Sequence, residues 1–299
     1  MTSPLDVGRL RLLREVGLRG SIAGAARMVG LTPSAVSQQL AILEREAGTA
    51  LVDRSPRGVV LTGAGETLAE RAGQVLDLLA TARADLDRLA GSVTGPVRIA
   101  SVASAAASIV STAVTALRES APGIQVSVVA AEPESGIGLL LTGDVDVAVV
   151  DEYDYVPLAL PESAVVRELT VEPLVVVRAA GASTSRTRLA DLADSDWVMP
   201  PENAACGRAV RAACRTAGFE PRVRWETDDM LLLVRAVAHG HGVAVLPRRS
   251  VADDAADVDV RPLREPELTR RLLAVARSSA AARPVVAEVL DALADACRG

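Results

Sequence analysis

The sequence predicts an α + α/β protein with a small helical N-terminal part, one long helix and a larger α/β part made of two lobes. Three observations support this prediction. Residues 21–46 have the pattern of two short helices joined by a turn, residues 63–90 repeat apolar side chains at helical spacing, and short apolar strands alternate with helices after residue 96. A chain of 299 residues is long enough for two or three domains.

Capping residues delimit the two short helices. Ser21 can cap the first helix, and Gly30 suits the left-handed conformation that often ends a helix. Thr32 can cap the second helix, with Pro33 at the first position, where an N–H would be unpaired anyway. We expect the two helices to pack through their apolar residues, which are Ile22, Ala25, Ala26 and Val29 in the first and Val36, Leu40 and Leu43 in the second.

The other face of the second helix carries Ser34, Ser37 and Gln38. Serine and glutamine both donate and accept hydrogen bonds, so they suit the base edges exposed in the DNA major groove. We therefore predict a helix-turn-helix from about Ile22 to Ala41 that places its second helix, including Thr32 and Pro33 at its start, on double-stranded DNA. The alternative is an ordinary helical hairpin with a solvated polar face.

The flanking segments favour the DNA-binding interpretation. Residues 5–18 form an amphipathic helix that offers Leu5, Leu10, Leu12, Leu13 and Val16 to a core. Residues 51–62 predict two short strands around a turn, and this wing carries Arg54 and Arg57, which can reach phosphates or a minor groove. The alternative is two solvated loop arginines. Residues 1–65 hold eight Arg and five acidic residues, a net charge of +3, whereas the whole chain carries −6, so the remainder carries −9.

A long helix is predicted from Gly63 to Ala90. Its apolar residues recur at helical spacing as Leu68, Ala72, Val75, Leu76, Leu79, Ala82, Leu86 and Leu89. A helix of about 28 residues is roughly 42 Å long, and it has too little core of its own to be stable alone. We expect it to pair with a second chain; the alternative is packing against its own body.

Residues 5–90 resemble the N-terminal half of the LysR-type transcriptional regulators. The matching residues are AARM at 25–28, TPSAVSQQLAILE at 32–44, Gly48, Leu51, Arg54, Leu61, Thr62 and Gly65. Two positions depart from the family: Leu12 and Leu13 replace an aromatic residue in the first helix, and Val52 stands where the family has Phe. The resemblance implies a sequence-specific DNA-binding regulator of transcription that forms a homodimer or a tetramer of two dimers and bends its DNA.

The remainder alternates strands and helices after a hinge at residues 91–96. The predicted strands are Val97–Val102, Ile124–Ala130, Val145–Val150, Val171–Arg178, Trp197–Met199, Arg222–Trp225, Val243–Leu246 and Arg271–Val275. The predicted helices are 104–119, 134–142, Leu189–Ala193, 205–217, Asp228–His239 and Pro284–Ala296. This alternation predicts parallel sheets covered by helices on both faces, with crossings between two halves near 160–170 and 260–270. It resembles the effector domain of the same family, which is built like a periplasmic binding protein.

These predictions divide the chain into three domains. We expect a winged helix-turn-helix over residues 1–62, a linker and dimerisation helix over 63–91, and an effector-binding domain over 92–299. Within the last domain, lobe I comprises about 96–163 and 266–299, and lobe II comprises about 164–265. A small-molecule effector is expected between the lobes.

The effector site is predicted at the carboxyl ends of strands and the starts of helices. The candidate residues are Ser101, Ser104, Pro200, Asn203, Thr227 and Asp228. Ser104 and Thr227 could equally be plain helix caps, and Asp228 could stabilise a helix start without any ligand. Glu202 and Asp228 could recognise a cationic group, as in an amino acid or an amine.

Other functional classes have little support. His239 and His241 lack metal-site spacing, Cys206 lacks the motif of a catalytic nucleophile, and residues 136–138 do not continue into a phosphate-binding loop. We expect no enzymatic activity, no cofactor and no metal. With no signal peptide, no membrane-length apolar run and an odd cysteine count, a reduced cytoplasmic protein without membrane contact is expected. A plain solute-binding protein would need an export signal and would have no use for the helix-turn-helix. An architectural DNA-binding protein would not need the large α/β part.

Overall fold

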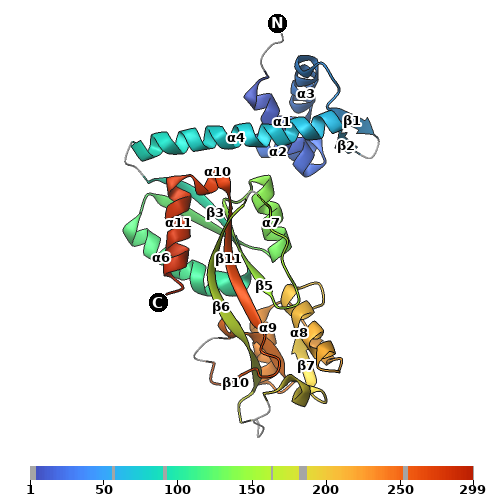
Figure 1. Ribbon diagram of the computed structural model, residues 1–299, viewed down its shortest axis with the longest axis vertical. Coiled ribbons are helices and arrows are strands. Elements are labelled where there is room, and N and C mark those ends of the chain that lie inside the picture. The colour runs from blue at the N-terminus through green and yellow to red at the C-terminus, as the bar shows by residue number, and fades with distance from the viewer. Residues whose placement is uncertain are drawn as a thin grey trace. The chain divides into compact units, whose positions relative to one another are not determined.

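The structure is a computed structural model that describes residues 5–55, 58–89, 93–162, 164–181, 187–251 and 255–298 (Figure 1). The chain divides into two compact units. The first, called the head here, comprises Met1–Ser92 together with Ser278–Pro284. The second, called the body, comprises Val93–Arg277 and Val285–Gly299.

The head consists of helices and one hairpin, and the described residues of α1 to α4 and of the hairpin share an apolar core. The helices are α1 (Val7–Arg19), α2 (Ile22–Val29), α3 (Pro33–Ala47), α4 (Gly63–Leu89) and α10 (Ser278–Ala281), and the hairpin strands are β1 (Val52–Ser55) and β2 (Gly58–Leu61). Most of the predicted apolar residues of α1, α2 and α3 lie in or against this core. Leu5 was predicted there wrongly: it is 39% exposed, because α1 begins only at Val7, after its N-cap Asp6.

The start of α4 is fixed against the start of the hairpin. The Thr62 backbone N–H donates to the Leu51 carbonyl oxygen over 3.0 Å, and the Thr62 hydroxyl donates to the Ala50 carbonyl oxygen over 2.8 Å. A Cβ atom at Gly65 would lie only 1.9 Å from the Leu51 carbonyl oxygen. Only glycine allows the two backbone segments to approach so closely.

Among the described residues, seven strands of the body form one mixed sheet. The order is β10 (Val258–Pro262), β6 (Ala164–Ala179), β11 (Thr269–Arg277), β5 (Val147–Tyr153), β3 (Gly95–Ser101) and β4 (Ile124–Ala130), with β9 (Ala244–Pro247) also paired to β6. The strands β7 (Asp196–Met199) and β8 (Arg222–Glu226) pair separately in parallel.

The prediction of parallel sheets is therefore only partly right. β3 runs parallel to β4 and β5, whereas β6, β9, β10 and β11 all pair antiparallel. A parallel pairing needs a crossover of a dozen or more residues, usually a helix. The described residues between β5 and β6 hold no helix. The first predicted crossing, near 160–170, coincides with the start of the long strand β6, which therefore joins the two halves of the sheet. The second, near 260–270, lies between β10 and β11.

Helices pack on these strands in separate apolar clusters. The helical elements of the body are α5 (Ala103–Ala105), a π-helix (Ala106–Val110), α6 (Ser111–Ser120), α7 (Pro133–Thr142), α8 (Ala205–Thr216), α9 (Met230–Ala238), α11 (Pro284–Asp295) and two 3₁₀ turns (Leu189–Leu192 and Arg248–Ser250). One cluster joins α7 to β3, β5 and β11. Another joins α8 to β6 and β7, and a third joins α9 to β6, β9 and β10.

Candidate nucleic-acid interface and ligand cavity

Local capping fixes the helix-turn-helix of the head. The Ser21 hydroxyl accepts from the Gly24 backbone N–H over 3.1 Å at the start of α2, and α2 ends at Gly30, whose φ is 72°. The Thr32 hydroxyl accepts from the Ala35 backbone N–H over 3.2 Å at the start of α3, and Pro33 occupies the first turn. All four capping predictions are confirmed.

The helix α3 has one buried face and one polar face. Val36, Leu40 and Leu43 are buried, as predicted. On the other side Ser34 and Gln38 are exposed, Ser37 is half-buried, and Thr32 and Pro33 are exposed at the start of the helix. The head therefore presents hydroxyl and amide groups on a rigidly packed helix, which is the arrangement needed to contact base edges.

Two interactions that the sequence did not suggest hold α3 in place. The Glu44 carboxylate accepts from the backbone N–H groups of Leu51 and Val52 over 2.9 and 3.2 Å, which ties α3 to the hairpin. Arg9 of α1 pairs with Glu46 of α3 over 2.7 Å. The predicted wing is present as β1 and β2, but Arg57 and the side chain of Arg54 lie outside the described residues.

The two halves of α4 differ in their surroundings. Ala72 is buried and Leu68 is partly buried against the core of the head. Farther along, Leu78, Leu79 and Leu86 are 71%, 50% and 61% exposed. The predicted Ala90 and the side chain of Leu89 lie outside the described residues. The second half of α4 thus carries large apolar side chains that are open to solvent.

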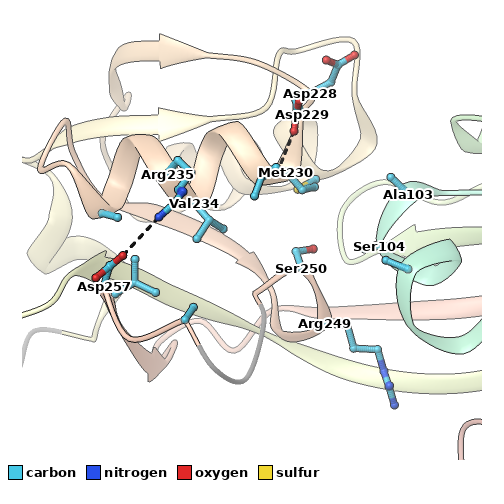
Figure 2. A pocket seen from close by; sticks show the side chains of 15 residues that line it. Ala103, Ser104, Asp228, Asp229, Met230, Val234, Arg235, Arg249, Ser250 and Asp257 are labelled. Atoms are coloured by element: carbon cyan, nitrogen blue, oxygen red, sulfur yellow. Dashed lines mark hydrogen bonds and ion pairs between the residues drawn. The ribbon is translucent and has the colours of Figure 1, made fainter. Parts of the chain in front are cut away.

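The body contains a cavity of about 530 Å³, called the apolar cavity here (Figure 2). It lies between the start of α5, the helix α9 and the segment that leads into β10. Its lining comprises Ala103, Ser104, Ala107, Asp228, Asp229, Met230, Leu231, Val234, Arg235, Ala238, Arg249, Ser250, Ala255, Asp257 and Val258. This volume is within the usual range of small-molecule sites.

A much smaller cavity of about 30 Å³, called the acidic cavity here, adjoins it. The two share Ala103, Ser104, Asp228 and Met230. The remaining lining of the acidic cavity is Val102, Glu132, Asp151, Tyr153, Pro200, Ala204, Ala205, Cys206 and Arg270. Both cavities thus have polar residues of their own: the apolar cavity adds Asp229, Arg235, Arg249, Ser250 and Asp257.

A buried cluster of charges borders the acidic cavity. The Arg270 side chain is 1% exposed and donates to the Glu172 carboxylate, to the Asp151 carboxylate over 3.1 Å and to the Ser104 hydroxyl over 2.7 Å. The Tyr153 hydroxyl donates to Asp151 over 2.9 Å. Such a charge can remain buried only because each guanidinium edge meets a carboxylate or hydroxyl oxygen.

Burial dominates the acid–base behaviour of this region. Desolvation raises the pKa of Asp151 even though Arg270 opposes the shift, and it raises the pKa of Tyr153 well above its usual value. Desolvation also raises the pKa of Cys206 to about 12. At the rim, desolvation and the neighbouring Asp151 and Asp228 raise the pKa of Glu132. Cys206 is thus a neutral thiol at neutral pH, and a thiol is a poor nucleophile.

The six residues predicted for an effector site do not all line the two cavities. Ser104, Pro200 and Asp228 do, whereas Ser101, Asn203 and Thr227 do not. Glu202, the other predicted contact for a cation, is exposed and belongs to neither lining. The prediction therefore found half of its residues at the cavities.

Two of the three serine and threonine hydroxyls among them, those of Ser101 and Thr227, are engaged locally. Ser101 is buried and donates its hydroxyl to the Val102 carbonyl oxygen, and the Thr227 hydroxyl accepts from the Asp229 backbone N–H. Neither Ser104 nor Thr227 is a helix N-cap, since Val102 and Asp229 occupy those positions. Of these hydroxyls, only that of Ser104 lies in the lining of a cavity.

Sequence reasoning missed the residues that shape the acidic cavity most strongly. Arg270, Asp151 and Glu172 come from three different strands, and no local motif announces them. It also missed the π-helix at Ala106–Val110, which includes the lining residue Ala107. Single-turn π segments within helices are rare and are frequent at functional sites.

Neither a metal-binding cluster nor a membrane-spanning helix is present among the described residues. They contain no group of three or more His, Cys, Asp or Glu side chains that could hold a metal ion. No helix in the described ranges is both long and apolar enough to cross a membrane. Cys206, Cys214 and Cys297 are all free thiols.

Comparisons with known proteins place both parts of the chain. Residues 7–66 match the family model "Bacterial regulatory helix-turn-helix protein, lysR family", and residues 90–298 match "LysR substrate binding domain". The probable HTH-type transcriptional regulator LrrA of Synechococcus elongatus is 30% identical over 97% of this chain and 96% of its own length.

Solved structures share the fold. A full-length OxyR variant from Pseudomonas aeruginosa superposes with a TM-score of 0.71 at 20% identity, covering 99% of this chain and 95% of that one. Full-length CbnR complexed with its target DNA gives a TM-score of 0.57 at 20% identity, covering 98% and 99% of the two chains. The order of head and body elements along the chain is therefore shared with full-length structures.

Proposed function

This chain belongs to the LysR family of bacterial helix-turn-helix regulators, and we propose that α3 reads an operator while the cavities of the body bind the effector that controls it. The protein is a DNA-binding transcriptional regulator with a substrate-binding domain. The observation that supports the DNA-reading role most directly is the capped and tightly packed α3 with its polar face.

Base recognition is assigned to Ser34, Ser37 and Gln38, with Thr32 and Pro33 at the start of α3. A glutamine amide can bond an adenine edge in two places, which gives Gln38 the largest contribution to sequence preference. Arg54 and Arg57 on the wing would contact phosphates or a minor groove, which positions the head without specifying sequence. CbnR, a protein of the same fold, has been determined with its target DNA.

Pairing of two chains through the second half of α4 would provide two heads for two half-sites. Leu78, Leu79 and Leu86 lie exposed there, and burying such side chains contributes roughly 1.5–3 kcal/mol each. Doubling the contacts also compensates for the small positive charge of one head. A dimer, or a tetramer of two dimers, is the proposed functional unit.

The domain boundaries proposed for these roles are 1–62 for DNA binding, 63–91 for pairing and 92–299 for effector binding, with lobe I at about 96–163 and 266–299 and lobe II at about 164–265. The proposed effector-binding residues are Ser101, Ser104, Pro200, Asn203, Thr227 and Asp228. Of these, Ser104, Pro200 and Asp228 are supported by their place in the lining of the cavities. We propose that the protein is cytoplasmic, because its target is DNA, and that it has no enzymatic activity, because the relatives that it resembles are named as regulators of transcription.

A salt-dependent gel shift combined with footprinting tests this function. The probe is DNA from immediately upstream of the protein's own coding region, and the control is a scrambled duplex of the same composition. We expect a protected region with two half-sites, one helical turn or a multiple of it apart. Equal affinity for the scrambled duplex at every salt concentration would contradict sequence-specific reading of that region.

A further inference from the structure

We propose that Arg45 is a further DNA-binding residue, which holds a phosphate group at the rim of the major groove beside the bases that Gln38 contacts. This assignment rests on the proposed function, because it takes α3 to be the helix that enters the groove. It goes beyond that function by giving a DNA contact to the last turn of α3, outside the residues assigned to base recognition.

Arg45 lies on the polar side of α3. It is exposed in the last turn of the helix and follows Gln38 by seven residues. Seven residues are close to two full helical turns, so the two side chains leave α3 on the same side. The buried residues Val36, Leu40 and Leu43 lie on the other side. The side of α3 that offers hydroxyl and amide groups therefore also carries a guanidinium group.

The separation of Gln38 and Arg45 along the helix fits the width of the groove. Seven residues of α-helix rise by about 10.5 Å, and the major groove of B-DNA is about 12 Å wide. When the Gln38 amide meets base edges, we expect the last turn of α3 to lie near the phosphates that border the groove. The C-terminal end of the recognition helix contacts the DNA backbone in homeodomains, which dock in a related way.

The conformation of the Arg45 side chain suits such a contact. Its Nε–H group donates to the carbonyl oxygen of Ala41 over 3.3 Å, so the side chain is folded back onto the preceding turn of α3, in the direction of Gln38. This bond uses only the Nε donor. The terminal nitrogens have no hydrogen-bond partner among the described residues. A guanidinium presents these donors as a fork that fits phosphate oxygens.

The carboxylates next to Arg45 in the sequence are engaged elsewhere. Glu44 accepts from two backbone N–H groups at the start of the hairpin, over 2.9 and 3.2 Å. Glu46 pairs with Arg9 of α1 over 2.7 Å. Arg45 has no ion pair among the described residues, so the exposed side of the last turn carries an uncompensated positive charge. A phosphate of the DNA backbone would compensate it.

A purely structural role for Arg45 is the alternative, because the helix dipole favours a cation in the last turn of a helix. The end of α3 has other supports, however. The helix ends at Gly48, whose φ of 69° is the left-handed conformation that glycine adopts easily. Glu44 and Glu46 hold its last two turns against the hairpin and α1. We therefore expect loss of Arg45 to change DNA binding and to leave the stability of the head unchanged.

The test measures how the affinity for DNA depends on salt. The full-length protein and its Arg45→Gln variant are titrated against a labelled duplex at several KCl concentrations, and binding is followed by fluorescence anisotropy. We expect the variant to bind about tenfold more weakly at low salt. The slope of log K against log salt should fall by about 0.9 for each Arg45 that meets a phosphate. The upstream and scrambled duplexes should lose affinity alike, because phosphates carry no sequence information.

Arg11→Gln is the matched control. Arg11 is an exposed arginine of the same unit without an ion pair among the described residues, and it lies on α1, outside the helix-turn-helix. The control removes the same charge and should leave the salt slope unchanged. An equal fall of the slope in Arg11→Gln would overturn the proposal, because the effect would then come from the total charge of the head.

Arg45→Lys separates the charge from the geometry of the guanidinium. It keeps a cation, so the salt slope should equal that of the unmodified protein, but it loses the fork, so binding at low salt should stay weaker. The melting temperature without DNA should be the same for all variants. An unchanged slope in Arg45→Gln would overturn the proposal, and a lowered melting temperature with that unchanged slope would assign Arg45 the structural role instead.

The outcome for Arg45 can be told apart from the outcome for the proposed function. Phosphate contacts form on any sequence, so the salt slope can be measured on the scrambled duplex alone. If the upstream DNA is bound no more tightly than the scrambled duplex, sequence-specific reading of that region fails, while the slope of Arg45→Gln still decides the phosphate contact. If the protein binds no duplex at any salt concentration, both proposals fail.

Discussion

The head and the body assemble their sites in opposite ways. In the head, the polar face of α3 and its capping residues come from one short stretch of the chain, and the cap bonds span three residues. In the body, Arg270 bonds groups that are 98, 119 and 166 positions away in the sequence. A site built from local contacts can be recognised in a sequence by its spacing, whereas a site built from distant strands exists only once the sheet has formed.

The polar groups of the two sites also differ in their exposure to solvent. The polar face of α3 is exposed, so its groups exchange water for a ligand at little cost. The charges of Arg270, Asp151 and Glu172 are buried and depend on one another. Removing one group should therefore impair function in the head but stability in the body.

Arg270→Met is the change with the largest expected effect. It leaves the buried carboxylates of Asp151 and Glu172 without their cationic partner, which should lower the free energy of unfolding of the body by about 3–5 kcal/mol. Trp197 and Trp225 are the chain's two tryptophans and both lie in the body, so denaturation followed by tryptophan fluorescence reports on this unit. Arg208→Met is the control, because Arg208 pairs with Glu134 at the surface, where an ion pair contributes roughly 0–1 kcal/mol.

Gln38→Ala is the corresponding change in the head. It should reduce sequence preference on DNA and leave stability unchanged, whereas Arg270→Met reduces stability. We expect the ratio of operator to scrambled-DNA affinity to fall by the equivalent of about 1–3 kcal/mol, while the melting temperature stays unchanged because Gln38 is exposed. Gel shifts at one fixed salt concentration measure the ratio. An equal loss of affinity on both duplexes would show that Gln38 contributes to general binding only.

A side-chain N-cap begins at least one helix in each unit, so the stability that a cap contributes can be compared between the two units. Thr32 caps α3 in the head and Asp229 caps α9 in the body. Thr32→Ala and Asp229→Ala should each cost about 1 kcal/mol of stability. If the two units differ only in how their sites are assembled, the two costs should agree when chemical denaturation is followed by circular dichroism. A cost several times larger at one position would mean that its cap does more than end a helix.

The smallest expected effect is a difference in the rates at which the three cysteines of the native protein react with a thiol reagent. Burial raises the pKa values of Cys206 and Cys214 to about 12, so both stay protonated at pH 8. We expect iodoacetamide to modify the half-buried Cys297 first and the other two only after unfolding, as judged by mass spectrometry of peptides. Arg270→Met should speed labelling of Cys206, whose cavity it disrupts. Rapid labelling of Cys206 in the unmodified native protein would contradict its burial.

The difference between the units also explains what could be predicted from the sequence. Ser21, Gly30, Thr32 and Pro33 each have a local preference that marks a helix end, and all four do so in the structure. Arg270 has no such preference. The strand predicted from the sequence begins at Arg271 and so leaves Arg270 out. The two neighbours have different surroundings, since Arg270 is buried, whereas Arg271 pairs with Glu152 near the surface. Successive side chains of a strand point to opposite faces, so this distinction depends on what covers each face.

The clamp between α4 and the hairpin has a mechanical consequence. Thr62 bonds two successive carbonyl groups of the chain before β1, and Gly65 packs directly on the second of them. These contacts hold the residues before β1 against the first turn of α4, so we expect the hairpin and the start of α4 to move together. We expect a change in the orientation of α4 to move the hairpin with it, so the orientation of α4 sets where the hairpin can lie along a DNA groove.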